Sequence, residues 1–155
     1  MIKYLLFLIL PIIISACGGF QVRELSIVGF EKYVAQFEKD AYNHGKLIII
    51  DDLVIQFGDL KKLYPDKDWV GVCQRYYYNT ANTITIDKAY WDKTSEEGRE
   101  WLIYHEISHC ALNRNHRDDF LPETKCVASI MYHKVRHECY YNLKDYYLKE
   151  LFTIP

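Results

Sequence analysis

The chain has 155 residues, half of them apolar, with a formal net charge of −2. This length suits one domain with a hydrophobic core and is short for two. Because charges of both signs are mixed and no long block of like charge occurs, the composition argues against nucleic-acid binding and against a charged tail. We expect a single compact domain that is monomeric.

The first sixteen residues, MIKYLLFLILPIIISA, predict a secretory signal peptide over residues 1–16. They combine an early Lys3 with an apolar run that is interrupted by Pro11 and is short for a membrane-spanning helix. The stretch that ends in Cys17 resembles the lipobox of bacterial lipoproteins, which implies acylation of the Cys17 sulfur. A simple cleaved signal or a weak membrane anchor is the alternative.

A lipid on Cys17 would make residues 17–25 a tether and residues 26–155 the folded domain. No aspartate follows Cys17, so analogy with bacterial lipoprotein sorting favours the outer membrane over the inner one. We therefore expect a lipid-anchored protein of the cell envelope, with its domain in the periplasm or at the cell exterior.

Export would place the other cysteines in an oxidising compartment. They form an even set of four, which allows two disulfides in three connectivities: Cys73, Cys110, Cys126 and Cys139. No CxxC pair is present, so a structural zinc site made of thiolates is a poor fit.

The first part of the domain predicts one helix and several strands. Apolar residues recur at intervals of three and four from about Ser26 to Asn43, which is typical of an amphipathic helix, and His44-Gly45 ends it. Short β-branched runs follow and indicate a small mixed or antiparallel sheet: KLIII, LVIQF, WVGVCQRYYY and TITID.

The second part predicts mainly helix. Thr94 and Glu97 match a capping box, so a helix should begin near Ser95 and continue to about Leu112. A turn, a loop rich in Asp and Pro, and a last helix from Ile130 or later to Phe152 should follow. The fold class that we expect is α+β.

The sequence HEISHCALNRNH, residues 105–116, contains the candidate site. His105 and His109 are four residues apart, so they lie on one face of the predicted helix and can bind one zinc ion. Glu106 lies at the flank, where it can take a proton from a metal-activated water without binding the metal itself. This division of roles suits hydrolysis of peptide bonds.

A catalytic zinc needs a third protein ligand and keeps a fourth position for water. His116 is the leading candidate, because the helix can end at Asn113 and turn to bring His116 back beneath the metal. Four carboxylates remain as alternatives: Asp118, Asp119 and Glu123 in the following loop, and Glu138 in an arrangement with a later glutamate ligand.

These motifs resemble the metzincin clan of zinc peptidases, whose pattern is HExxHxxGxxH followed by a turn that contains a methionine. Here Ser129-Ile130-Met131-Tyr132 resembles that Met-turn, in the form with tyrosine directly after methionine. The resemblance covers about residues 82–132 and differs in two ways. His116 comes seven residues after the second histidine instead of six, and Leu112 or Asn113 replaces the glycine, Asn113 being the next best residue for a left-handed turn.

The resemblance implies a zincin-like domain with an active-site helix, a Met-turn and a C-terminal helix. Its bound zinc would hydrolyse a peptide or protein substrate lying along TITID as the edge strand, with Met131 supporting the metal site. The chain also resembles small bacterial lipoproteins with HELGHC, LNR and SIM segments. The alternative function is a non-catalytic surface lipoprotein that acts as a binding module, with a structural or vestigial metal site.

Two further expectations concern residues near the motif. Cys110 is turned about 100° around the helix from His109, so we expect it in a disulfide, with Cys126 as its partner, and not at the metal. His133 and His137 are four apart on the expected last helix, and with Lys134 and Arg136 nearby they predict a solvated basic face.

Overall fold

The computed structural model describes residues 25–76 and 81–153. The predicted signal peptide and the lipidation site Cys17 lie outside these residues. Within the described ranges, no helix has both the length and the apolar composition needed to cross a membrane.

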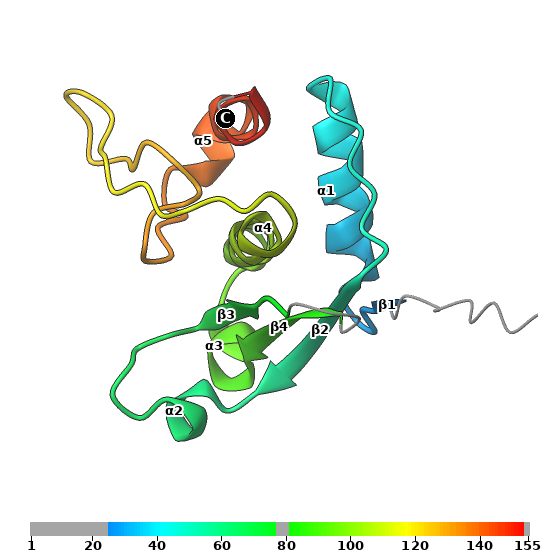
Figure 1. Ribbon diagram of the computed structural model, residues 1–155. Helices are drawn as coiled ribbons and strands as arrows, with labels where there is room; N and C mark the ends of the chain where they lie inside the picture. Colours follow the sequence, from blue (N-terminus) through cyan, green and yellow to red (C-terminus); the bar gives the residue numbers. More distant parts are fainter. Residues whose placement is uncertain (1–24, 77–80, 154–155) are drawn as a thin grey trace, which may run out of the picture.

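A mixed sheet of four strands forms one layer of the molecule (Figure 1). Its order is β1-β2-β4-β3, and only β3 is antiparallel to its neighbour. The strands are β1 (Leu25–Ser26), β2 (Leu53–Gly58), β3 (Gly71–Gln74) and β4 (Asn82–Asp87). The α+β fold class and the mixed sheet are thus confirmed.

Two expectations about the strands are wrong. The TITID segment belongs to β4, which is an inner strand paired with β2 on one side and β3 on the other, so β3, and not TITID, is the edge strand on this side of the sheet. The KLIII segment, residues 46–50, forms no strand. It runs beside the first helix, where the Ile50 N–H donates to Glu38 (2.7 Å) and Ile50 is buried, so its apolar residues pack without strand pairing.

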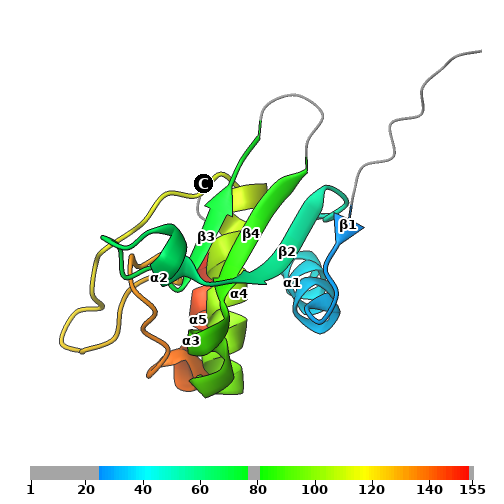
Figure 2. The ribbon, with the colours of Figure 1, turned by 90° about the horizontal axis from the view of Figure 1, so that it is seen from below.

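The helix α4 (Glu96–Ala111) lies across the sheet and is the centre of the fold (Figure 1, Figure 2). It contacts β3 and β4 on one side and the helices α1 (Glu31–Asn43) and α5 (Tyr140–Thr153) on the others. Trp101, Ile103 and Ile107 are fully buried. Because α4 is enclosed on nearly all sides, polar residues in its middle are held in an apolar environment.

The helix ends differ modestly from the expectation. Ser95, and not Thr94, caps α4, since its Oγ accepts from the Gly98 N–H (3.3 Å). The first helix begins at Glu31 because Gly29, at φ 86°, reverses the chain after β1. Its expected apolar stripe is buried nonetheless: Phe30, Val34, Phe37 and Ala41.

Two of the remaining helices are short, and the last one begins close to the C-terminal end of the described residues. The helices α2 (Leu60–Leu63) and α3 (Lys88–Lys93) are each preceded by an aspartate whose side chain caps the helix by accepting a backbone N–H. The last helix, α5, begins only at Tyr140, so His133 and His137 lie in the loop before it and not on a helix face. The placement on a helix was wrong, since the turn around Met131 and the Cys126–Cys139 disulfide precede α5. The expected solvated basic character is present, because His133, Lys134 and Arg136 are exposed.

The four cysteines form two disulfides, as predicted, with the pairings Cys73–Cys110 and Cys126–Cys139. The expected pairing of Cys110 with Cys126 is wrong. Cys110 lies on the side of α4 that contacts β3, where Cys73 lies 5.7 Å away between Cα atoms. Cys126 instead pairs within its own loop with the residue that precedes α5.

Candidate metal centre

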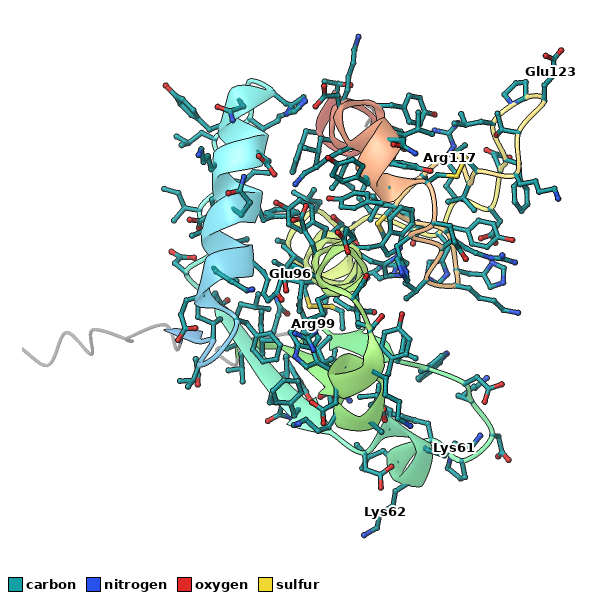
Figure 3. All side chains as sticks on the ribbon, turned by 180° about the vertical axis from the view of Figure 1, so that it is seen from behind. Lys61, Lys62, Glu96, Arg99, Arg117 and Glu123 are labelled. Carbon is teal, nitrogen blue, oxygen red and sulfur yellow. A yellow bond between two sulfur atoms is a disulfide. The ribbon has the colours of Figure 1, made fainter. Side chains whose placement is uncertain are left out.

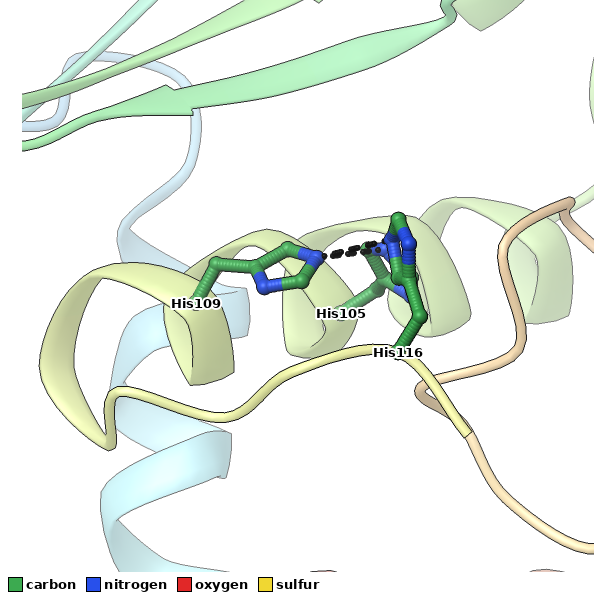
Figure 4. A group of neighbouring side chains, drawn as sticks. All are labelled: His105, His109 and His116. Atoms are coloured by element: carbon green, nitrogen blue, oxygen red, sulfur yellow. Dashed lines mark hydrogen bonds between the residues drawn. The ribbon is translucent and has the colours of Figure 1, made fainter. Parts of the chain in front are cut away.

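Three imidazoles converge beside α4 (Figure 4). His105 and His109 project from the helix and His116 from the loop that follows it, and one ring nitrogen of each lies within 4.8 Å of the others. The His109 Nε2 is 3.0 Å from the His105 Nε2 and 3.1 Å from the His116 Nε2. Among the described residues, this is the group of side chains that can hold a metal ion.

The opposite ring nitrogens of the two helical histidines are anchored by backbone carbonyls. The Nδ1 of His105 lies 2.8 Å from the Ile130 oxygen, and the Nδ1 of His109 lies 2.6 Å from the Arg114 oxygen. A carbonyl only accepts, so each Nδ1 must carry the hydrogen and each Nε2 must present its lone pair. Lone pairs that face one another at this distance repel, and a cation between them removes the repulsion.

The geometry and the protonation of the three residues fit a metal ion. Tetrahedral ligands at about 2.0–2.1 Å from zinc are separated from one another by about 3.3 Å, close to the two distances of 3.0 and 3.1 Å that join the His109 Nε2 to the other rings. Burial lowers the pKa of His105 to about 3, with the charge of His109 as a smaller cause. Burial also lowers the pKa of His109 and of His116. The rings are therefore neutral at neutral pH, which is the form that binds metal.

The turn after α4 brings His116 back to the helix. Asn113 adopts φ 55°, in the left-handed region, and the Arg114 N–H donates to the Ser108 carbonyl (3.0 Å). The asparagine thus takes the conformation for which glycine is the usual residue. The additional residue between His109 and His116 is accommodated in this turn.

The alternative third ligands lie elsewhere. Asp118 accepts from the Nδ1 of His133 (2.7 Å), and Asp119 pairs with Arg117 (3.0 Å). Glu123 lies at the outer tip of its loop, directed away from α4 (Figure 3). Neither these three nor Glu138 belongs to the metal-binding group found among the described residues.

Glu106 lies between α4 and the edge strand. Its side chain is buried, and its carboxylate accepts the backbone N–H of Cys73. A Cβ atom at Gly71 would lie 2.5 Å from the Glu106 Oε1, so β3 can pass over the carboxylate only because residue 71 is glycine. Burial raises the pKa of Glu106 to about 8, and the hydrogen bond from Cys73 opposes this rise.

The residues Ser129 to Tyr132 form a tight turn beneath His105. The Tyr132 N–H donates to the Ser129 carbonyl (3.3 Å), and the central Met131 is fully buried. The same turn supplies the Ile130 carbonyl that anchors His105. The structure therefore brings the SIMY segment to the histidines, as the sequence resemblance implies.

A cleft of ≈ 600 Å³ joins these features. The edge strand and the residues on either side of it line one wall, and α4 contributes Leu102, His105, Glu106 and His109. The remainder comes from Tyr90 of α3 and from the loop segments after α4. The two candidate chemical groups, the imidazole cluster and the Glu106 carboxylate, therefore open onto one space large enough for several residues of a peptide.

The family comparison agrees with this site. A model of the family described as "Putative phage metallopeptidase" matches residues 54–147, which is more than half of the chain and includes the three histidines, Glu106 and Met131. The chain belongs to this family. No match was found among curated proteins or among solved structures.

Several groups that support the site were not predicted from the sequence. These are Gly71 over Glu106 and the backbone carbonyls of Ile130 and Arg114. A glycine inside the strand-like WVGVC indicates a close backbone approach, so Gly71 could have been found. The carbonyls could not, because every residue has one and only the fold selects which of them face a histidine.

Proposed function

We propose that the protein is a zinc-dependent endopeptidase, anchored to a bacterial membrane as a lipoprotein, with a metzincin-like site. The observation that carries this proposal is the convergence of the three Nε2 atoms in the cleft that also contains the buried Glu106. Membership in a metallopeptidase family supports the same reaction class.

Zinc is the metal that suits the donor set. Three neutral imidazoles, with space left for a further ligand, match the usual catalytic zinc site, whereas calcium and magnesium prefer oxygen donors. When bound, the ion would supply Lewis-acid catalysis and lower the pKa of water. His105, His109 and His116 are the residues that would hold it.

Glu106 is placed to move the proton of the reaction. With a cation held by the three histidines, whose charge would lower the pKa of Glu106 again, its carboxylate would accept a proton from the attacking water and deliver it to the nitrogen of the departing amine. The Cys73 N–H holds the carboxylate, and burial excludes bulk water from around it. The backbone at Gly71 lies close against the Glu106 side chain, which would limit its movement during this exchange.

The substrate would bind as an extended peptide along β3. The edge strand lines the cleft, and apart from the Cys73 N–H, which donates to Glu106, its backbone groups on the side away from β4 can pair with a further strand. Addition of a strand would align the scissile carbonyl of a peptide or protein substrate with the histidine cluster. An extended segment that enters and leaves the cleft favours cleavage within chains.

The two disulfides support export to an oxidising compartment. With the lipobox-like sequence before Cys17, they favour a lipid-anchored protein of the cell envelope. Metabolic labelling with a fatty-acid analogue tests this part, since Cys17→Ser should remove the label. Retention of the label would contradict it.

The central test measures zinc content and proteolysis of the purified full chain and of two variants. We expect about one zinc per chain, and Glu106→Ala should keep the zinc while proteolysis falls about 10²–10⁴-fold. Glu97→Ala, an exposed glutamate on the same helix, is the matched control and should leave both unchanged. If the wild type binds zinc and cleaves no member of a diverse peptide library, the protein is a binding module and the proposal is wrong.

A further inference from the structure

The buried residue Glu150 on α5 lies outside the cleft and joins the segments that carry the metal centre. Its side chain is only 1% exposed. One carboxylate oxygen contacts the Arg114 Nη2 (2.8 Å) and the Arg117 Nη1 (3.3 Å), and the other accepts from the Ser129 Oγ (2.8 Å). Figure 3 shows Arg117 beside α5.

Two of these partners, Arg114 and Arg117, lie on either side of His116 along the chain. The Arg114 carbonyl is the group that anchors the Nδ1 of His109. The Arg114 side chain also donates to the Leu151 carbonyl on α5 (3.1 Å). The loop that carries His116 is therefore fixed to α5 at both of its ends through one carboxylate.

The other partner belongs to the turn beneath His105. The Ser129 Oγ donates to Glu150 and accepts the Met131 N–H (3.0 Å), which holds the turn in shape. That turn presents the Ile130 carbonyl to His105. The Arg117 N–H also donates to the Met131 carbonyl (2.8 Å), so the two segments are bound to each other as well as to Glu150.

We propose that Glu150 is a positioning residue of the metal centre, which aligns all three imidazoles through Arg114, Arg117 and Ser129 without contacting metal or substrate. The inference rests on the proposed function only in that the three histidines hold a metal ion. It assigns to α5 a role in the site that neither the HExxH motif nor the Met-turn sequence indicates.

Stability alone gives a weak reason for a carboxylate at this position. Several residues close to Glu150 on α5 are apolar and buried, among them Leu148, Leu151 and Phe152. Replacing a buried ion pair by a well-packed apolar group is often neutral or stabilising. A carboxylate differs from such a group in its ability to hold two guanidinium groups and a hydroxyl in fixed directions at once.

Glu150→Gln tests the inference through metal binding, because it keeps the size of the side chain and removes its charge. We expect the zinc dissociation constant, measured by chelator competition, to rise about 10–100-fold, as for other outer partners of metal ligands. The visible absorption spectrum of the Co²⁺-substituted protein should change as well, since it reports ligand geometry. Glu150→Asp, which keeps the charge, should recover part of the affinity.

The matched control is Glu100→Gln. Glu100 also joins α4 to α5, through Lys144 (2.5 Å) and Tyr140 (2.6 Å). These contacts involve neither the loop that carries His116 nor the turn beneath His105. It should lower stability and leave zinc affinity and the Co²⁺ spectrum unchanged. If Glu150→Gln behaves in the same way, or if the wild type binds no metal, the inference is overturned.

A second variant covers the case in which Glu150→Gln does not fold. Arg117→Met removes one of the two guanidinium contacts from a side chain that is 39% exposed, and it should weaken zinc binding several-fold. An unchanged affinity contradicts the inference. Neither measurement needs peptide cleavage, so a protein that binds zinc without proteolysis would refute the proposed function and leave the role of Glu150 standing.

Discussion

Asn113 determines the direction of the chain after the site helix. It adopts φ 55° one residue before Arg114, whose carbonyl anchors His109, and three residues before His116. Most L-residues lose roughly 1–2 kcal/mol in this left-handed conformation, while glycine and asparagine tolerate it. The position of two imidazoles thus depends on one backbone dihedral angle.

The free energy of unfolding of Asn113 variants should reflect this conformational cost. We expect Asn113→Ala to lower the free energy of unfolding by about 1–2 kcal/mol, and Asn113→Gly to change it by about 0.5 kcal/mol or less. Urea denaturation of the two variants at constant zinc measures the difference. Equal stability of the alanine and glycine variants would show that the turn is not strained.

Gly71 has an equally local role in placing Glu106. A methyl group at residue 71 would meet the Glu106 Oε1 at 2.5 Å and its Cγ and Cδ at 2.9 Å, so the carboxylate would have to leave its position. We expect Gly71→Ala to keep zinc and to lower kcat/KM about tenfold or more, because a small displacement of a reacting group is costly.

A crowding control for Gly71 exists at the other end of α4. A Cβ atom at Gly98 would meet the Thr94 Oγ1 at 2.7 Å and the His137 ring at 3.1 Å, and it would touch none of the three histidines of the metal centre. Gly98→Ala should therefore leave kcat/KM unchanged. Full activity of Gly71→Ala would mean that Glu106 needs no such confinement.

The pairing of β3 with α4 is the element-level feature on which the cleft depends. The Cys73–Cys110 disulfide joins the two elements directly beside the hydrogen bond from Cys73 to Glu106. The Cys126–Cys139 disulfide closes a shorter loop before α5 and touches neither wall. The two bridges should therefore differ in their effect on activity.

Removal of each bridge by paired serine substitutions tests this difference. From the entropy of loop closure, loss of Cys73–Cys110 should lower the free energy of unfolding by about 4 kcal/mol, and loss of Cys126–Cys139 by about 3 kcal/mol. Only the first should also reduce activity under conditions where the protein is folded. If both variants keep full activity when folded, the disulfide does not hold the cleft wall.

Local patterns predicted the elements of this fold better than their arrangement. The stripe through Phe37, the end of α1 at His44 and the position of α4 all follow from spacing and capping. The place of β3 at the edge does not, because strand order depends on contacts between distant residues. The same holds for the pairing of Cys110, which depends on the side of α4 that faces the sheet.

The candidate site shows the same division. The pair His105 and His109 is a property of one helix and was evident from its spacing of four residues. His116 joins this pair only because of the turn at Asn113, where the usual glycine is absent. The sequence therefore left carboxylates open as alternative third ligands. Glu150 gave no sequence pattern at all, because its partners lie 21 to 36 residues away.

The site unites segments from most of the chain: β3, α4, the following loop, the turn at Met131 and α5. An unfolded chain lacks this arrangement, so a metal that binds the site should stabilise the whole fold. At a zinc concentration about a thousand times the dissociation constant, the stabilisation should be about 4 kcal/mol. The two disulfides should keep the metal-free protein folded, although less stable.

Thermal unfolding with and without a chelator measures this linkage. We expect the chelator to lower the melting temperature by several degrees and zinc to restore it. His109→Ala should have a melting temperature that does not respond to either. A wild-type melting temperature that is independent of zinc would indicate that the metal binds outside the folded core or not at all.

The most direct test of the proposed metal centre is a crystal structure of the zinc-soaked protein, with anomalous scattering recorded at the zinc edge. We predict one strong anomalous peak at about 2.0–2.1 Å from the Nε2 atoms of His105, His109 and His116. A peak bound by Asp118, Asp119 or Glu138 in place of His116, or no peak beside the three imidazoles, would contradict it.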